Sequence, residues 1–332
     1  MNFIHLPDHS LAVSRVCLGT MMFGDKCDYP ATEMIVKRSL EVGFNFFDTA
    51  AMYSNGVCEE YLGRALRGSL REKLFITTKV VKGINRQSIL ESIDESLARL
   101  KMDYVDLYLI HWPVAGMKIK EMMQALNDVV CSGKTRLVGC CNFPAYLVAA
   151  SNAIAAENGW AKLVNNQVAY NLFERGVEVE ILPQALLENI AITAYRPLAV
   201  GLLTGNFLPG AKMNTANRGA ADSRVITWLA QHGHSIERFV QYAAKKNITP
   251  VQLAAAWVMH NPAIAAPIMG VSSLAQVDAA ASVCDVKLSD VEYNEVTDLF
   301  HTGVFEEGYQ LFPGLTYNFP RLRRNLSVAV RE

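Results

Sequence analysis

The sequence predicts a (β/α)8 barrel, also called a TIM barrel, in which eight parallel strands alternate with helices within one domain of residues 1–332. Short apolar segments of strand length alternate with helical segments of roughly 10 to 15 residues, which is typical of a parallel sheet. Eight such strands favour a closed barrel over an open doubly wound sheet. The chain contains no G-x-G sequence, so the phosphate-binding signature of the open fold is missing as well.

Composition limits the function classes that fit the chain. Of the 332 residues, 51% are hydrophobic and 19% are charged, and the net charge is -1. These values support a large buried core and give no electrostatic reason to expect a nucleic-acid partner or an anionic membrane surface. No run approaches the roughly 20 apolar residues that span a bilayer, so we expect a cytoplasmic protein. Seven cysteines without C-x-x-C spacing favour neither a metal site nor a disulfide framework.

The first half of the chain supplies a hairpin and four strand-and-helix units. Apolar residues 3–6 and 11–13 flank a Pro-Asp-His-Ser turn and predict a hairpin ahead of the barrel. The first barrel strand, residues 15–18, enters a turn between Gly19 and Gly24, where glycine allows the backbone to approach a ligand closely. The predicted elements that follow are helix 31–41, strand 44–48, helix 59–66, strand 74–79, a helix from the N-cap Asn85 to Leu100, strand 105–110 and a helix that ends at Ser132.

The second half continues the alternation with one interruption. Its first elements are strand 135–138, helix 145–156, strand 163–171, helix 177–189 and strand 190–195. Residues 201–223 show no periodicity, and a connection of this length is typical of an active-site lid or a disordered segment. Helices 235–246 and 250–260, strand 264–269 and helices 274–283 and 289–300 complete the barrel. The tail 302–332, rich in Gly, Pro and aromatic residues, is expected to be irregular and to pack near the barrel mouth.

Polar side chains follow three consecutive predicted strands. Asp48 ends the second strand, Tyr53 lies five positions further on, Lys79 ends the third strand and His111 follows the fourth. Taken alone, Asp48 would be a turn cap and Tyr53 a packing residue. In a barrel the carboxyl ends of all strands meet at one mouth, so we expect the four side chains to share a site. There Lys79 would stabilise a Tyr53 phenolate, Asp48 would neutralise Lys79, and His111 would donate to a substrate oxygen. This combination predicts protonation of an alkoxide, which is half of carbonyl reduction.

Seven short motifs occur along the chain in a characteristic order. They are G-F-N-F-F-D-T-A with Tyr53, T-T-K at Lys79, L-I-H-W-P at His111, V-G-C-C-N-F at Asn142, N-Q-V-A-Y-N at Gln167, Y-R-P-L-A-V-G-L-L-T-G at Tyr195 and P-I-M-G-V-S-S at Gly270. With these motifs, residues 4–283 resemble the aldo-keto reductase family, and the long loop is similar to its channel-β-subunit branch. The resemblance implies NAD(P)H-dependent reduction of aldehydes and ketones to alcohols. It also implies that Asp48, Tyr53, Lys79 and His111 form the catalytic tetrad, with Tyr53 as the general acid.

By the same resemblance, the cofactor is NADPH, extended across the barrel mouth. Asn142 and Gln167 match the residues that hold the nicotinamide carboxamide, and Tyr195 matches the aromatic residue that stacks on the nicotinamide ring. The remaining matched positions are Gly19, Thr20 and Met21 at the nicotinamide ribose, Leu198, Gly201 and Leu203 at the pyrophosphate, and Gly270, Ser272, Ser273 and Gln276 at the adenosine-phosphate end.

Some positions depart from the family pattern. Arg196 stands where many members have Ser, which makes its charge a candidate contact to phosphate or substrate. Arg218, in the long loop, is either a further phosphate contact or a solvated arginine. The Glu-Asn pair that commonly holds adenine aligns with Ala279 and Ala280, which cannot hydrogen-bond to the adenine edge. NADH is therefore the alternative cofactor.

The side chains beside the matched positions predict an apolar substrate pocket. Met22, Met52, Trp112 and Phe143 would suit aromatic or medium-chain aldehydes and ketones. The aromatic residues of the tail either complete this pocket or seal the side of the barrel; they are Phe305, Tyr309, Phe312, Tyr317 and Phe319.

Two other function classes fit part of the pattern. A regulatory subunit of the channel-β kind would bind the cofactor and turn over slowly with the same tetrad. A Schiff-base aldolase would use Lys79 as a nucleophile at a strand end. For an aldolase, however, Tyr53, Asn142, Gln167 and Tyr195 would have no common purpose.

Overall fold

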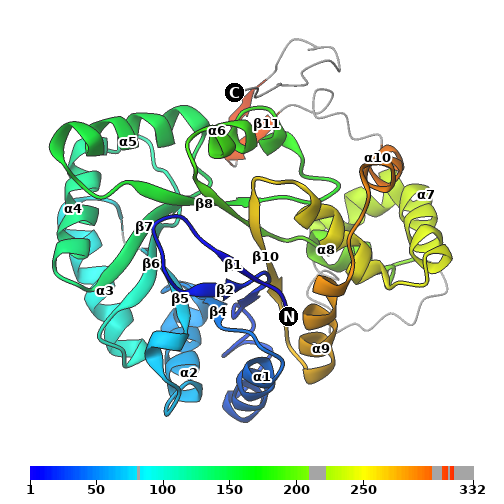
Figure 1. Ribbon diagram of the computed structural model, residues 1–332, viewed down its shortest axis with the longest axis horizontal. Helices are drawn as coiled ribbons and strands as arrows, with labels where there is room; N and C mark the ends of the chain where they lie inside the picture. The colour runs from blue at the N-terminus through cyan, green and yellow to red at the C-terminus, as the bar shows by residue number, and fades with distance from the viewer. Residues whose placement is uncertain (81–82, 209–221, 301–308, 313–314, 318–332) are drawn as a thin grey trace.

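Eight parallel strands close into a barrel, which confirms the predicted fold (Figure 1). The computed structural model describes residues 1–80, 83–208, 222–300, 309–312 and 315–317. Around the barrel the strands follow the order β10-β3-β4-β5-β6-β7-β8-β9, so each strand pairs with its neighbour in sequence and β10 closes on β3. Their bounds are β3 Cys17–Gly19, β4 Phe46–Asp48, β5 Phe75–Val80, β6 Val105–Ile110, β7 Thr135–Cys141, β8 Leu163–Ala169, β9 Ala191–Tyr195 and β10 Ile264–Gly270.

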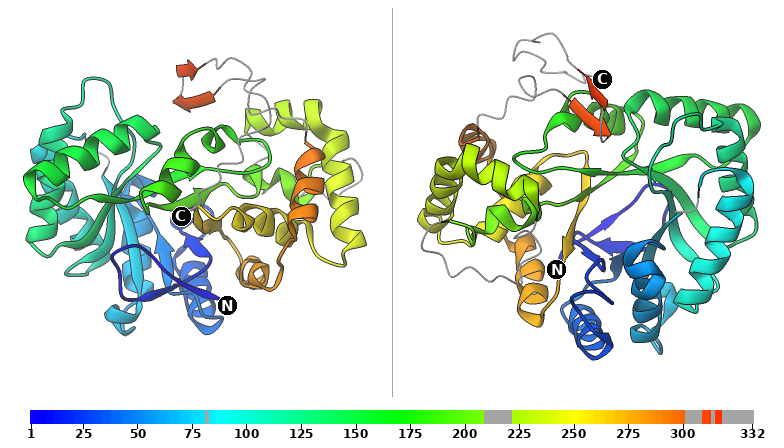
Figure 2. Two further views of the ribbon diagram at one scale, coloured as in Figure 1. Left: turned by 45° about the horizontal axis from the view of Figure 1, so that its top comes forward. Right: turned by 180° about the vertical axis from the view of Figure 1, so that it is seen from behind.

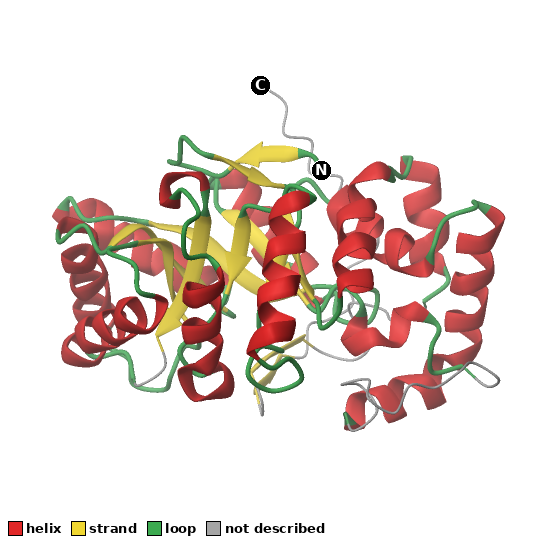
Figure 3. Cartoon of the chain, turned by 90° about the horizontal axis from the view of Figure 1, so that it is seen from below, coloured by secondary structure: helices red, strands yellow, loops and turns green. Residues whose placement is uncertain are grey.

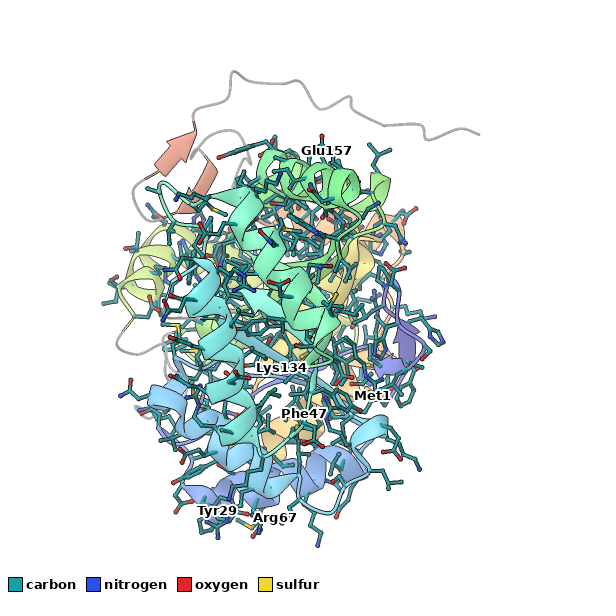
Figure 4. The ribbon with its side chains drawn as sticks, turned by 90° about the vertical axis from the view of Figure 1, so that its left-hand side faces the viewer. Met1, Tyr29, Phe47, Arg67, Lys134 and Glu157 are labelled. Atoms are coloured by element: carbon teal, nitrogen blue, oxygen red, sulfur yellow. The ribbon has the colours of Figure 1, made fainter. Side chains whose placement is uncertain are left out.

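Helices surround the strands on the outside of the barrel (Figure 3). They are α1 Tyr29–Glu41, α2 Val57–Ala65, α3 Arg86–Leu100, α4 Ile119–Cys131, α5 Ala145–Asn158, α6 Ile181–Leu187, α7 Ser223–Lys245, α8 Pro250–His260, α9 Leu274–Ser282 and α10 Asp290–Asp298. Figure 4 views one wall from outside, with Tyr29 at the start of α1 and Glu157 near the end of α5 at opposite ends of the molecule. Among the described residues, no helix combines the length and the apolar character needed to cross a bilayer.

Alternation along the strands decides which side chains reach the barrel interior. In β5, Phe75 belongs to the inner hydrophobic cluster, whereas Ile76 and Val80 belong to the cluster between the sheet and the helices. Successive side chains of a strand point to opposite faces, so Thr77 and Lys79 share the inner face with Phe75. In β6 the inner positions are Leu107 and Leu109. The same parity therefore directs residue 111 inward, just past the end of this strand.

The N-terminal hairpin covers the amino end of the barrel, opposite the mouth (Figure 1). Its strands are β1 Phe3–His5 and β2 Ala12–Ser14, close to the predicted ranges. Leu6 and Val13 pack into the inner cluster. Asn45, which precedes β4, accepts from the Ser14 N–H at 2.7 Å and donates to the Ala12 carbonyl at 2.9 Å. The hairpin thus seals this end, and functional groups gather at the other.

The segment after β9 differs from the prediction. Helix α7 begins at Ser223 instead of residue 235, because Asp222 caps it by accepting from the Arg224 N–H. Trp228 in the unpredicted part stacks on Phe173 with ring centroids 5.1 Å apart, a contact that local sequence does not show. The connection that follows β9 begins with the 3₁₀ segment η4, Ala199–Thr204, and Arg218 lies outside the described residues.

The tail also differs from the irregular segment that we expected. Two short strands, β11 Tyr309–Phe312 and β12 Leu315–Tyr317, pair as an antiparallel hairpin. Strand β11 lies beside the 3₁₀ segment η3, Gly176–Glu178, which follows β8 (Figure 2). This hairpin is therefore on the side of the barrel mouth. Phe305 and Phe319 lie outside the described residues, so the role of the tail aromatics stays a prediction.

Candidate active site

A buried ion pair lies at the carboxyl ends of β4 and β5. The Lys79 ammonium donates to Asp48 Oδ1 at 2.6 Å and to the Thr49 carbonyl at 2.7 Å. Lys79 has no exposed surface, and Asp48 is 3% exposed. Burial disfavours the ammonium, but the Asp48 carboxylate, with Tyr53 and Cys141 acting in the same direction, raises the pKa of Lys79. At neutral pH the site therefore contains a buried cation.

Tyr53 places its hydroxyl beside this cation. It begins the 3₁₀ segment η1, Tyr53–Gly56, and its oxygen lies 3.4 Å from Lys79 Nζ. Burial raises the pKa of Tyr53 to about 12, and Lys79 only partly opposes this effect. Lys79 favours the phenolate, as we expected, but desolvation outweighs the nearby cation, so the net shift of the Tyr53 pKa is upwards. Tyr53 consequently keeps its proton at neutral pH and can act as a donor.

His111 completes the group of four. Its ring lies 6.0 Å from the Tyr53 ring at an angle of 76°. Burial, with a further contribution from Lys79, lowers the pKa of His111 to about 3. Its Nδ1 is buried without a hydrogen-bond partner in the described part of the chain. At neutral pH the imidazole is therefore uncharged, and it retains one N–H that can donate to a substrate oxygen.

The lowered pKa of His111 predicts acid sensitivity. Between the ordinary value of 6.5 and about 3, the unfolded chain binds a proton that the folded chain excludes, so stability falls as pH falls. We expect wild type to lose up to roughly 1.4 kcal/mol per pH unit from this residue, and His111→Gln to show a shallower slope. Urea unfolding at several pH values between 7 and 4 measures it. His234→Gln, which replaces a histidine 83% exposed at its side chain, should leave the slope unchanged, and equal slopes for all three proteins would contradict the prediction.

The residues predicted to hold a nicotinamide carboxamide lie next to these four. Gln167 Nε2 donates to Asp48 Oδ2 at 2.8 Å, and no donor among the described residues bonds to its Oε1, which can accept from a ligand. Asn142 Oδ1 accepts from the Tyr195 hydroxyl at 2.7 Å, and its Nδ2 lies 3.4 Å from the His111 carbonyl. The second N–H of that amide remains available. One acceptor and one donor side by side match the donor and acceptor of a carboxamide, so these residues fit the group.

The positions predicted for the rest of the cofactor lie along the rim of the mouth. Gly19 and Gly270 are partners in the β3–β10 pairing, and a Cβ added at Gly270 would have open space around it. Ser273 caps α9 by accepting from the Gln276 N–H, and Gln276 Oε1 accepts from both the backbone and the hydroxyl of Ser272. The serine hydroxyls and this helix terminus suit an anionic group.

Other positions in these predicted groups are placed as follows. Leu203 is buried in the outer cluster, so any cofactor contact from it would use its backbone. Leu198, Gly201, Met21 and Met22 are half-buried. Thr20 is buried, and its hydroxyl donates to the Asp48 carbonyl at 3.0 Å. Ala279 is half-buried, whereas Ala280 packs in the core.

The predicted substrate pocket needs one correction. Met52 and Trp112 are exposed, and the Trp112 ring stacks on His111 with centroids 6.4 Å apart. Phe143 is different, because it is fully buried in the cluster between sheet and helices. Its backbone N–H and carbonyl bind the side chain of Asn166. It therefore supports the turn after β7 and does not line the mouth.

Sequence reasoning named Arg196 as a candidate contact but missed its two partners, Glu174 and Asn171. Arg196 extends its guanidinium to Glu174, with Nη1 2.8 Å from Oε1. Asn171, which is fully buried, donates to Glu174 Oε2 at 2.8 Å and to the Arg196 carbonyl at 3.0 Å. Asn171 ends the motif at Gln167, so its position was visible in the sequence, but its partners come from two separate loops.

Comparison with known proteins identifies the family of the chain. The model of the aldo/keto reductase family matches residues 15–300. An alignment with the "Uncharacterized oxidoreductase YrpG" of Bacillus subtilis (strain 168) is 30% identical and covers 90% of this chain and 96% of that protein. The "Versiconal hemiacetal acetate reductase" of Aspergillus parasiticus is 30% identical over 89% of this chain and 96% of its own length. The "Probable voltage-gated potassium channel subunit beta" of Arabidopsis thaliana is 31% identical over 86% of this chain and 92% of its own. Within the described ranges, no group of three or more His, Cys, Asp or Glu side chains is placed to hold a metal ion.

Proposed function

Because the chain belongs to the aldo/keto reductase family and is an oxidoreductase with a nicotinamide cofactor, we propose that it is an NADPH-dependent carbonyl reductase. In this proposal it converts aldehydes or ketones to alcohols, and Tyr53 donates the proton. The observation that carries the proposal is the cluster at the barrel mouth: a protonated phenol beside a buried ammonium, with a neutral imidazole next to it.

The protein groups have separate tasks in this reaction. When bound, the dihydronicotinamide ring supplies the hydride. His111 would donate to the substrate carbonyl oxygen and orient it through the one N–H that its neutral ring retains. Tyr53 would transfer its proton to the same oxygen as that oxygen becomes an alkoxide, a much stronger base than a phenolate. Lys79 then stabilises the phenolate that remains, and Asp48 keeps Lys79 charged.

Residues at the α9 terminus support the preference for NADPH. Ser272 and Gln276 offer polar groups there without a carboxylate, which suits the additional phosphate of NADPH. Ala279 and Ala280 supply no side-chain hydrogen bond to adenine, so affinity would depend on the phosphate and nicotinamide ends. NADH is the alternative.

The exposed apolar surface at the mouth supports the substrate class. Trp112 and Met52 flank His111 and Tyr53 with aromatic and flexible thioether surface. Such a surface favours aromatic and medium-chain aldehydes and ketones over small polar ones. Affinity should therefore increase with the apolar area of the substrate.

A cofactor titration followed by a carbonyl panel tests the proposal. We expect purified protein to bind NADPH more tightly than NADH, and to oxidise NADPH in the presence of an aromatic aldehyde such as 4-nitrobenzaldehyde. Intrinsic fluorescence measures binding, and absorbance of the reduced cofactor measures turnover. Absence of binding to either cofactor would refute the proposal, and a preference for NADH would correct it.

The regulatory-subunit alternative has one observation in its favour, which is the similarity to a protein named as a probable channel β subunit. Tight cofactor binding with turnover far below the usual enzyme range of about 1 s⁻¹ or more would support it. The geometry is against the aldolase alternative. A Schiff base needs a neutral amine, whereas Lys79 is fully buried and paired with Asp48. A lysine adduct trapped by borohydride would overturn this conclusion.

A further inference from the structure

An ion pair lies against the ring of Tyr195, and the proposed reaction does not use it. The Arg196 guanidinium lies over the Tyr195 ring, 4.7 Å from its centroid, and bonds to Glu174. Arg196 has a φ of 57°, in the left-handed region that costs most non-glycine residues free energy. A strained backbone that holds a charge against a functional ring indicates a specific role for that charge.

Hydrogen bonds from Asn171 position both Glu174 and Arg196. The buried amide of Asn171 donates to the Glu174 carboxylate and to the Arg196 carbonyl, and its Oδ1 accepts from the N–H groups of Phe173 and Glu174. One side chain therefore fixes both members of the pair. Each is one quarter exposed, so its charge is only partly screened by solvent.

A second ion pair lies near the first. Asp222 and Arg224, at the start of α7, are joined by a contact of 2.6 Å. The hydrogen-bonded Arg224 lowers the pKa of Asp222 to about 2, and Arg196 contributes to the same direction. The two pairs are thus near enough to interact. Two carboxylates balance two guanidiniums, and loss of Glu174 alone would leave an uncompensated positive charge beside Tyr195.

We propose that the Glu174–Arg196 pair sets the relative affinity of the site for the oxidised and reduced forms of the nicotinamide cofactor. This inference rests on the proposed function, in which Tyr195 contacts the nicotinamide ring. The oxidised ring carries a positive charge that the reduced ring lacks, so a neighbouring guanidinium opposes only the oxidised form. Glu174 offsets that repulsion. Arg196 is in this sense a specificity residue, and Glu174 is its positioning residue.

The test measures the dissociation constants of NADP⁺ and NADPH separately by titration calorimetry with the full chain. Glu174→Gln should raise the ratio of the oxidised to the reduced dissociation constant by about three- to tenfold. Arg196→Met should lower that ratio by a similar factor, and the double variant should return it towards wild type. The shifts should shrink at high ionic strength, as expected for a charge effect.

Glu178→Gln is the matched control, because Glu178 is in the same segment but pairs with Arg175. The ratio of its NADP⁺ to its NADPH dissociation constant should equal that of wild type. Equal weakening of both cofactor forms in Glu174→Gln and Arg196→Met, with an unchanged ratio, would show a merely structural role and overturn the inference. If wild type binds neither form, the proposed function fails and the inference fails with it. Binding by wild type with an unchanged ratio in the variants refutes only the inference.

Discussion

Replacing Tyr53 by Phe is expected to lower kcat for carbonyl reduction by about 10²- to 10⁴-fold, the usual contribution of a positioned general acid. The change removes the hydroxyl that lies 3.4 Å from Lys79 Nζ. It keeps the ring that packs edge-on against His111. Because burial raises the pKa of Tyr53 to about 12, the wild-type donor is fully protonated at neutral pH. Lowering the pH therefore cannot compensate for the loss of this hydroxyl.

The cofactor should still bind to Tyr53→Phe with a dissociation constant within about twofold of wild type, since the predicted carboxamide contacts come from Asn142 and Gln167. Stopped-flow turnover of an aromatic aldehyde together with a fluorescence titration separates the two effects. Undiminished turnover by Tyr53→Phe would contradict the role of Tyr53 as proton donor. A large loss of cofactor affinity would move that role from proton transfer to binding.

The fold was predictable because its signals are local. The apolar run of β6 and the proline that begins α8, Pro250, place both elements at the ranges that the sequence predicts. Strand β7 was harder, since it continues through Gly139 to Cys141 and the glycine reads as a turn. A Cβ at Gly139 would lie 2.6 Å from the Asn165 carbonyl oxygen, so the residue is small because strands pack closely there. Such a reason is visible only in three dimensions.

In the candidate site, too, some features could be predicted from local sequence and others depend on the three-dimensional structure. Asp48, Lys79 and His111 each lie at the carboxyl end of a strand, and the barrel topology alone brings them together. The bond from Gln167 to Asp48 spans 119 positions, and the bond from Glu174 to Arg196 joins two loops. No local pattern encodes these contacts. The direction of the Tyr53 pKa also depends on how deeply the phenol is buried, which residue types cannot show.

The second large effect is expected from breaking the buried Lys79–Asp48 ion pair. Replacing Lys79 by Met should destabilise the protein by about 3–5 kcal/mol, because among the described residues it leaves the buried Asp48 carboxylate with Gln167 alone as a side-chain partner. The methionine fills nearly the same volume, so the loss reports charge and not a cavity. Reduction should also fall by at least about a hundredfold, since no cation remains to stabilise the Tyr53 phenolate. Urea unfolding and turnover measure the two quantities.

A double variant separates the structural from the chemical contribution. Adding Asp48→Asn to Lys79→Met removes both charges, and stability should return to within about 1–2 kcal/mol of wild type. Turnover should stay low, because stability can be recovered without the cation but proton transfer from Tyr53 cannot. If the double variant recovers turnover together with stability, Lys79 acts only by keeping the mouth folded. If the single variant loses no stability, the pair contributes no net free energy to folding, and the ammonium is retained for its charge beside Tyr53.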